Sequence, residues 1–219
     1  KNALTQYFKG QAATIPQNDE SYIRDGFFGN DHIYSIIRLL TRAASTLPIY
    51  LYEVKDEKSY RRYKNFQASD SPDYIKLKAL KTKGLEQVEK HRILDVLKNP
   101  NPLQGQAEFT ENVLGYKWLL GNSYIMGTGP TGGKLAGTVM EMNVLPSQHV
   151  SIKIGKSLEP IDSYILKQGH IEIPIPPEQI CHLKSWSPDY SGGGSHMYGV
   201  SPIRAGRSKI KIGNDATDT

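Results

Sequence analysis

Hydrophobic residues follow a helical period in the first quarter of the chain. Five of them fall at i, i+3, i+4, i+7 and i+11 and predict one apolar helix face: Ile33, Ile36, Ile37, Leu40 and Ala44. Asp31 suits the N-cap of this helix, and Pro48 ends it. The run 49–54 is rich in aromatic and β-branched residues, so it predicts a strand directly after the helix.

Two more helices follow later in the chain. Apolar periodicity predicts a short helix over 93–97 and a longer one over 109–120. The run Asn99-Pro100-Asn101-Pro102 between them predicts a loop, because the residue before a proline is pushed out of the α region. Gly121 suits the left-handed residue at the end of the longer helix. That helix is apolar on more than one side, so we expect it to pack against a sheet and against a second helix or a neighbouring subunit.

The second half of the chain reads as short strands separated by turns. The expected strands are 123–128, 138–145, 149–154, 164–167, 171–175 and 180–183. Pro174 places one of them at a sheet edge. Ser201 and Pro202 then predict the start of a final helix. The predicted fold class is α+β, with helices packed on a small antiparallel sheet or a barrel-like meander.

Composition narrows the classes of function. The chain has 219 residues, enough for a sizeable core, and a net charge of +5, which permits an anionic partner without requiring one. Its single cysteine, Cys181, excludes an internal disulfide framework and favours a reducing origin. We find no signal peptide, and no apolar run approaches the ~20 residues of a membrane-spanning helix. The missing initiator Met and the abrupt polar end suggest a trimmed or partial chain.

The segment 55–92 differs from its surroundings in charge. It holds eleven Lys or Arg against six Asp or Glu, and it has few strongly apolar residues. We expect a solvated, partly mobile insertion, because such a segment buries too little apolar surface to offset its ordering entropy. The alternative is a surface for nucleic acid or an acidic partner, since basic and aromatic residues interleave as they do in single-strand-binding sites. These residues are Tyr60, Arg61, Arg62, Tyr63, Lys64 and Phe66.

The motifs that carry chemistry are weak. The run 127–134 fails as a phosphate-binding loop, because Thr128 stands where the first glycine is required and Leu135 follows the lysine. A hairpin turn is favoured there. Cys181 and His182 point to opposite faces of a strand, so they cannot pair as nucleophile and base, although a thiol hydrolase using a distant histidine stays open. We expect no enzymatic activity, no cofactor and no metal site, since the histidines lack metal-ligand spacing.

Six blocks of the chain, in order, resemble the amino-terminal half of tailed-bacteriophage portal proteins of the HK97-like type. The blocks are 33–48 with its Ser45-Thr46-Leu47-Pro48 exit, 91–102 with the Asn-Pro-Asn-Pro loop, 109–125 with Gly121-Asn122-Ser123-Tyr124-Ile125, 144–150, 180–184, and 198–207 with Tyr198-Gly199-Val200-Ser201-Pro202. The chain departs from the pattern in its long basic spacer, and it stops before the family's stem and clip.

The resemblance implies a structural machine part. Portal subunits form a dodecameric ring, a head–tail connector at one capsid vertex through which double-stranded DNA is packaged and ejected. It implies further copies of the chain, the terminase motor, the major capsid protein and a head-completion or adaptor protein as partners. It implies a place in the virion, and in the host cytoplasm during assembly. A nucleic-acid-binding or adaptor module that uses the basic segment is the alternative.

The resemblance also divides the chain. We expect an amino-terminal arm at 1–29, a portal wing-like domain at 30–200 that contains the insertion 55–92, and the start of a helix toward the stem at 201–219. Candidate contacts with DNA or a partner are Arg61, Arg62, Lys64, Arg204, Arg207 and Lys211. Candidate subunit-interface residues are Tyr116 and Trp118.

Overall fold

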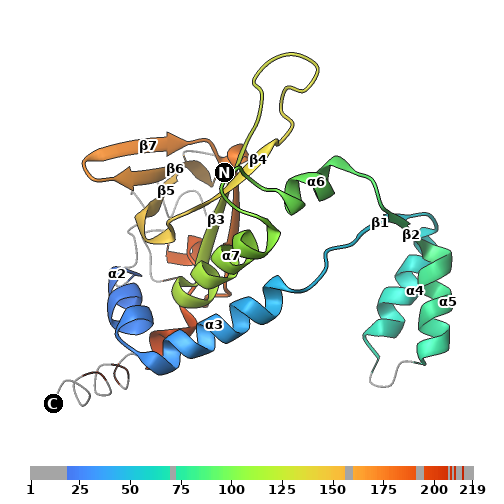
Figure 1. Ribbon diagram of the computed structural model, residues 1–219, viewed down its shortest axis with the longest axis horizontal. Helices are drawn as coiled ribbons and strands as arrows, with labels where there is room; N and C mark the ends of the chain where they lie inside the picture. The colour runs from blue at the N-terminus through green and yellow to red at the C-terminus, as the bar shows by residue number, and fades with distance from the viewer. Residues whose placement is uncertain are drawn as a thin grey trace. The chain divides into compact units, whose positions relative to one another are not determined.

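The chain folds into two compact units. A computed structural model describes residues 19–69, 73–155, 160–190, 195–206, 208, 210 and 214. Unit 1 is formed by residues 1–46 and 99–219, and unit 2 by residues 47–98. Helices and small antiparallel sheets build the chain, which confirms the predicted α+β class (Figure 1).

Unit 1 contains most of the regular structure. Its helices are α2 (Asp19–Ser21), the π-helix η1 (Tyr22–Phe28), α3 (Asp31–Ser45), α7 (Gln106–Leu120) and the 3₁₀ turns η2 (Ser147–His149), η3 (Pro177–Gln179), η4 (Ser195–Met197) and η5 (Pro202–Gly206). Its strands are β3 (Asn122–Thr128), β4 (Glu141–Leu145), β5 (Val150–Ile154), β6 (Ile161–Gln168), β7 (Ile171–Ile175) and β8 (Ile180–Lys184). The two long helices α3 and α7 pack against each other (Figure 1).

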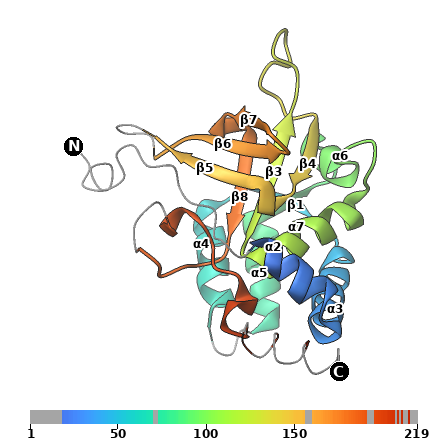
Figure 2. The ribbon, with the colours of Figure 1, turned by 90° about the vertical axis from the view of Figure 1, so that its left-hand side faces the viewer.

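Two three-stranded antiparallel sheets are present, in agreement with the prediction of helices packed on a small antiparallel sheet or a meander. One has the order β4-β3-β8 and the other β5-β6-β7 (Figure 2). The strand β3 takes β8, a strand far along the chain, as its second neighbour, and the consecutive strands β5, β6 and β7 form a separate meander. Pro174 lies on β7 at the edge of its sheet, as predicted.

The main core of unit 1 is built from the strands of both sheets. Its fully buried members are Tyr124, Leu145, Val150, Ile152, Ile154, Tyr164, Ile175, Met197 and Tyr198. A second buried cluster joins Tyr22 of η1 to Leu119 and Leu120 of α7. We predicted a weakly ordered arm over 1–29, but its part from Asp19 to Phe28 is helical because Tyr22 packs in this cluster. Residues 1–18 lie outside the described residues.

The N-terminus of α3 differs by one residue from the prediction, and the C-terminus of α7 agrees with it. The side-chain oxygen of Asn30 accepts a hydrogen bond from the Ile33 amide at 3.1 Å, so Asn30 is the N-cap of α3 and Asp31 its first residue. Gly121 ends α7 in the left-handed conformation, at φ 81°, as predicted. A Cβ there would lie 2.4 Å from the carbonyl carbon of Val200, so only glycine fits.

The loops that the sequence predicted are present in unit 1. The carbonyl of Pro100 accepts from the Met142 amide at 2.7 Å, and the Asn101 amide group donates to the Met142 carbonyl at 2.9 Å. These bonds fasten the Asn-Pro-Asn-Pro loop to β4. The run 127–134 lies in the hairpin connection between β3 and β4, where Thr128 pairs with Glu141. It is therefore a turn, as predicted.

Unit 2 has regular helices and strands over the segment 55–92, where we expected a solvated, partly mobile insertion, and most of its side chains are exposed. It contains β1 (Leu51–Val54), α4 (Glu57–Gln67), α5 (Tyr74–Gly84), β2 (Leu85–Val88) and α6 (Arg92–Lys98). The strands β1 and β2 pair antiparallel, and α4 packs on α5. The carboxylates of Asp56 and Asp73 cap the two helices by accepting from backbone amides one turn inside. Tyr63 and Phe66 are half-buried in this hairpin rather than displayed on its surface.

Candidate functional site

The helix α3 turns an apolar face to solvent in unit 1. Leu39 is 70% exposed and Ile36 56% exposed, and Leu40 is also exposed. Ile36 and Leu40 belong to the apolar face that the sequence predicted for this helix, but the structure leaves both exposed and buries Ile37 of the same face. The buried side of α3 is instead centred on Ile37 and Thr41, because the contact with α7 lies on that side.

This exposed face has the spacing of an interaction surface. Ile36, Leu39, Leu40 and Ala43 fall at i, i+3, i+4 and i+7, and all four are exposed. The apolar residues of α3 therefore extend around more of the helix circumference than the side that packs against α7. Contiguous exposed apolar patches of this kind are typical of interaction surfaces. This exposed stripe can be read from the sequence, but the sequence does not show which apolar side of the helix becomes buried.

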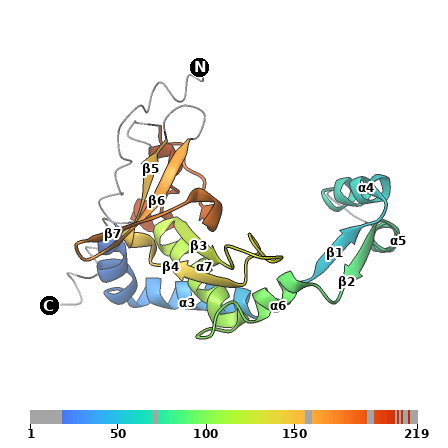
Figure 3. The ribbon, with the colours of Figure 1, turned by 90° about the horizontal axis from the view of Figure 1, so that it is seen from above.

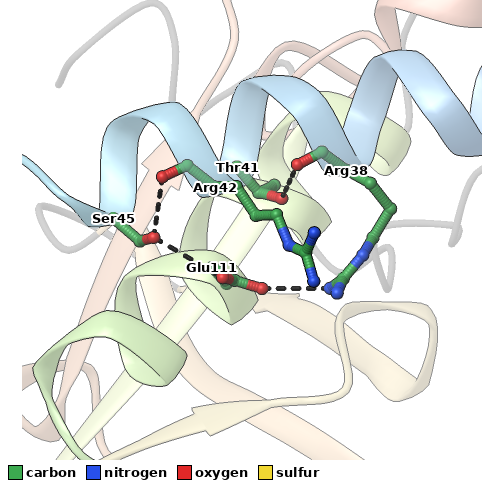
Figure 4. Close-up of polar contacts among 5 residues, drawn as sticks. All are labelled: Arg38, Thr41, Arg42, Ser45 and Glu111. Carbon is green, nitrogen blue, oxygen red and sulfur yellow. Dashed lines mark hydrogen bonds and ion pairs between the residues drawn. The ribbon is translucent and has the colours of Figure 1, made fainter.

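Polar contacts fix the opposite side of α3 on α7 (Figure 4). A guanidinium nitrogen of Arg38 lies 3.0 Å from a carboxylate oxygen of Glu111, and the pair is part-buried. The Ser45 hydroxyl lies 3.5 Å from the other Glu111 oxygen and donates to the Arg42 carbonyl at 2.9 Å. The Thr41 hydroxyl donates to the Arg38 carbonyl at 3.2 Å. Glu111 thus reaches two turns of α3 and sets the register of the two helices.

A cavity of about 360 Å³ lies between η1, α3 and α7. Its walls are mainly apolar, with Phe27 from η1, Ile37 from α3 and Leu119 from α7. The ion pair of Arg38 and Glu111 also lines it. The volume is within the range of pockets that hold a ligand or a large side chain.

The two predicted interface residues lie on α7 and are both half-buried. Tyr116 packs against the cluster of Tyr22, Leu119 and Leu120, and it lines the cavity. Burial raises the pKa of its hydroxyl. Trp118 does not line this cavity and is not among the residues packed against that cluster. Their role at a subunit interface stays a prediction.

The predicted basic contacts are divided between the two units. Arg61, Arg62 and Lys64 are exposed on α4 of unit 2, and Arg204 is exposed on η5 of unit 1. Arg61 forms an i,i+4 ion pair with Glu57 at 2.6 Å, which offsets its charge. The remaining two, Arg207 and Lys211, lie outside the described residues. Contact of any of these residues with DNA stays a prediction.

The motif residue Asn122 joins distant parts of unit 1. It is 2% exposed, and its side-chain oxygen accepts from the Gly199 amide at 2.6 Å. Its amide group donates to the Gly199 carbonyl at 3.1 Å and to the Leu120 carbonyl at 3.3 Å. The Ser201 hydroxyl donates to the Leu119 carbonyl at 2.6 Å, and the Ile152 amide donates to the Tyr198 hydroxyl at 2.8 Å. Two of the six sequence blocks therefore meet here.

His182 completes this cluster as a neutral aromatic side chain. Its Nε2 lies 3.1 Å from the Asn122 side-chain oxygen, and its ring stacks on Tyr124 at 4.3 Å between centroids. Burial, and secondarily the charge of Lys184, lowers the pKa of His182 to about 4. Burial likewise raises the pKa of Tyr198 to about 12. These groups are structural, since each is taken up in packing and hydrogen bonding.

The thiol of Cys181 is exposed on β8, in register with Ile125 on β3. The neighbouring His182 lies on the other side of the strand, against Tyr124, as predicted. No group of His, Cys, Asp and Glu side chains that could hold a metal occurs among the described residues. Within the same residues, no helix is long and apolar enough to cross a membrane.

The family model of the phage portal protein matches residues 74–219. The chain belongs to the phage portal protein family. This confirms the resemblance drawn from the six sequence blocks, and a structural role follows from it. The match includes the cluster around Asn122 and all of α7.

Solved structures of gene transfer agent (GTA) particles share the fold. The neck of the empty particle, computed with C6 symmetry, is 26% identical with a TM-score of 0.70, and the match covers 95% of this chain and 47% of that chain. The neck of the native particle, computed with C12 symmetry, is 22% identical with a TM-score of 0.70, over 98% and 47% of the two chains. An uncharacterized protein of Rickettsia bellii (strain RML369-C) is 26% identical over 148 residues, 66% of this chain and 36% of that protein. The chain thus spans about half the length of the neck proteins.

Proposed function

We propose that this chain is part of a portal subunit that assembles into a dodecameric ring at one capsid vertex. Double-stranded DNA passes through the ring when it is packaged and when it is ejected. The observation that carries the proposal is the match of the portal family model over residues 74–219. The neck structure computed with C12 symmetry supports a twelve-fold ring.

The exposed face of α3 fits a subunit of such a ring. A closed ring needs head-to-tail contacts between two different faces of each subunit. We propose that the apolar stripe of Ile36, Leu39, Leu40 and Ala43 is covered by a neighbouring copy. Burial of these side chains stabilises the contact by roughly 25 cal/mol for each Å² of apolar surface removed from water.

A conduit should let DNA slide rather than grip it. Phosphate contacts strengthen with each added Lys or Arg, so a dispersed basic balance suits passage better than a dense patch. The exposed basic residues fit this, because they are spread over α4 and η5 and some pair with acids. The terminase motor, the major capsid protein and a head-completion or adaptor protein are the proposed partners, and the virion is the proposed location.

The alternative, a nucleic-acid-binding or adaptor module, receives less support. Its aromatic residues Tyr60, Tyr63 and Phe66 are half-buried within unit 2, which leaves less of each ring for stacking on bases. Fluorescence anisotropy of the chain with double-stranded and single-stranded DNA, at low and moderate salt, separates the two proposals. Tight, salt-dependent binding by the isolated chain would favour the module.

The proposal is tested in particles that carry the full-length protein with an epitope tag. Gold-labelled antibody should mark one vertex of each capsid, and particles made without the protein should lack packaged DNA. Label on every vertex, or normal DNA content without the protein, would contradict the proposal.

A further inference from the structure

The helix α5 of unit 2 has an outer face with two large apolar side chains in water. Figure 3 shows α5 side by side with α4, at the end of the strands β1 and β2. Leu77, Leu80 and Gly84 of α5 are buried or half-buried and form its inner side. On the outer face, Tyr74 is 74% exposed and Ile75 is 79% exposed. Neighbouring large apolar side chains that are exposed in this way are typical of interaction surfaces.

Two shallow depressions adjoin on this face and share Ala79. The first follows the outer face of α5, where Tyr74 and Ile75 lie at one end and the smaller Ala79 and Thr82 lie further along. The second runs between α4 and α5, and its apolar wall includes Phe66 of α4. The walls of both depressions are mainly apolar. We call the two depressions together the α5 groove.

The charged residues that line the α5 groove are all basic. Lys78 and Lys83 line its first depression, and Arg62 and Lys76 line the second, while no Asp or Glu of the described residues lines either one. Lys76 pairs with Asp73 at 3.6 Å at the exposed start of the helix. Lys78 forms no ion pair within the part of the chain that the structure describes. The groove is therefore complementary to an occupant that is both apolar and negatively charged.

The shape of the α5 groove favours a helix as the occupant. A helix of eleven residues such as α5 is about 16 Å long, which matches about three turns of a second helix laid beside it. The small side chains of Ala79 and Thr82 let a second helix approach closely, and amphipathic helices bind grooves by apolar anchors at such spacing. Duplex DNA would meet the cations with its phosphates but would leave the apolar walls facing charge. A flat bilayer would contact Tyr74 and Ile75 without filling the depression beside them.

We propose that the α5 groove binds an acidic amphipathic helix of another protein. The apolar side chains of that helix pack on Tyr74, Ile75 and the wall at Ala79, and its carboxylates pair with Lys78 and Arg62. The buried apolar anchors supply most of the affinity, and the charges select the partner and its orientation. This inference gives unit 2 a docking role that goes beyond the proposed DNA conduit and does not depend on the ring.

A display library of helical peptides with randomised apolar, acidic and basic positions tests the chemistry of the partner. The library is selected on the immobilised full-length protein and, in parallel, on the double variant Tyr74→Ser with Ile75→Ser. Peptides enriched on the unchanged protein but not on the double variant should be rich in Asp and Glu, with apolar residues at i, i+3 and i+4. The proposal is overturned if the two selections enrich the same peptides, or if the peptides specific to the unchanged protein are basic.

Fluorescence anisotropy with the most enriched peptide then tests the charges. Lys78→Glu should raise the dissociation constant about 10-fold or more, and a single Glu→Lys change in the peptide should restore part of the loss. Lys90→Glu is the matched control, because it makes the same charge change at an exposed residue that does not line the groove. Leu103→Ser, at an apolar residue that is 88% exposed in unit 1, is the control for lost apolar surface. Both controls should bind like the unchanged protein, and equal losses for Lys78→Glu and Lys90→Glu would overturn the proposal.

Competition separates the peptide from the other anionic ligands. Duplex DNA, an oligothymidine strand and phosphatidylglycerol vesicles are each added to the complex with the labelled peptide at moderate salt. None of them should displace the peptide, since none supplies apolar anchors that fill the groove. Displacement by one of them that Lys78→Glu abolishes would assign the groove to that ligand and overturn the proposal.

A fluorine label places the bound peptide without removing an anchor or a charge. In a Cys181→Ser background, Thr82→Cys is labelled with a trifluoroacetone group, and Lys90→Cys carries the same label as the control. Addition of the selected peptide should shift the fluorine resonance at position 82 and leave that at position 90 unchanged. A peptide that binds without a shift at position 82 would lie elsewhere on the protein, and the proposal would be wrong.

Discussion

The side chain of Asn122 holds Gly199 by both of its backbone polar groups. Its oxygen accepts from the Gly199 amide at 2.6 Å, and its amide group donates to the Gly199 carbonyl at 3.1 Å. Gly199 has to be glycine, because an added Cβ would lie 2.1 Å from the Gly121 carbonyl oxygen. The end of α7 is thereby locked to the segment that leads out of the β-rich region.

Asn122→Ala should destabilise unit 1 strongly. The change leaves the Gly199 amide, two carbonyls and His182 without partners in a buried site, and each such group is unfavourable by about 1–3 kcal/mol. We expect a loss of about 3–5 kcal/mol in the free energy of unfolding, measured by urea denaturation. Asn143→Ala is the control, since the Asn143 side chain makes no hydrogen bond within the described residues, and it should change stability by less than about 1 kcal/mol. Equal effects of the two changes would show that the cluster does not lock the fold.

His182 should make the fold sensitive to acid. Its pKa is about 4 in the folded protein and 6.5 as a free side chain, so between these values the unfolded chain binds the proton first. Stability therefore falls as the pH drops from 6.5 toward 4, by up to roughly 3 kcal/mol. His182→Gln removes this titration, and its unfolding free energy should vary less over this range.

The titration of Asp19 changes the pH dependence of stability in the opposite direction to His182. A comparison of the unchanged protein with His182→Gln removes the contribution of Asp19. Burial raises its pKa to about 7, so its ionisation destabilises the fold as the pH rises. Because it is present in both proteins, the difference between unchanged protein and His182→Gln at each pH isolates the histidine. A difference that stays constant from pH 7 to pH 4 would mean that His182 is not buried as neutral imidazole.

Replacing the exposed stripe of α3 should separate assembly from folding. In Ile36→Gln with Leu39→Gln, the unfolding free energy should stay within about 0.5 kcal/mol, because both side chains are exposed. The full-length protein should assemble more weakly, as measured by sedimentation. Ile37→Gln is the matched control on the buried face of the same helix and should destabilise the fold by about 2–5 kcal/mol. Unchanged assembly in the double variant would exclude the stripe as a contact.

The basic residues of α4 should influence DNA passage only mildly. Arg61, Arg62 and Lys64, all replaced by Ser, should leave thermal stability within about 0.5 kcal/mol, since exposed ion pairs contribute little. In full particles, DNA packaging should change slightly, and more at low salt, where screening is weakest. Loss of ring assembly at every salt concentration would instead make unit 2 an interface element.

Local signals in the sequence predicted much of the fold. Proline and glycine marked the loop at 99–102 and the end of α7, and short runs between turn residues located the strands of both sheets. The hairpin of unit 2 was missed because its high charge concealed the helix caps Asp56 and Asp73. Capping depends on one residue at one position, and the overall composition of a segment does not show where that residue lies.

The candidate surfaces depend on pairings that no local pattern encodes. The sequence shows that α3 is widely apolar, but only the packing of α7 reveals that Ile37 is buried and Leu39 exposed. Gln148 of η2, which lines the cavity, gave no sequence signal, because only the folded structure shows its side-chain oxygen buried with no hydrogen-bond partner among the described residues. The link between Asn122 and Gly199 joins residues 77 positions apart.

The symmetry of the assembled full-length protein tests the central claim most directly. Electron cryo-microscopy of the purified particle, without imposed symmetry, should show a closed ring of twelve copies with an open central channel and head-to-tail contacts. Monomers at high concentration, or a two-fold dimer with identical faces in contact, would contradict the assignment of this chain to a portal ring.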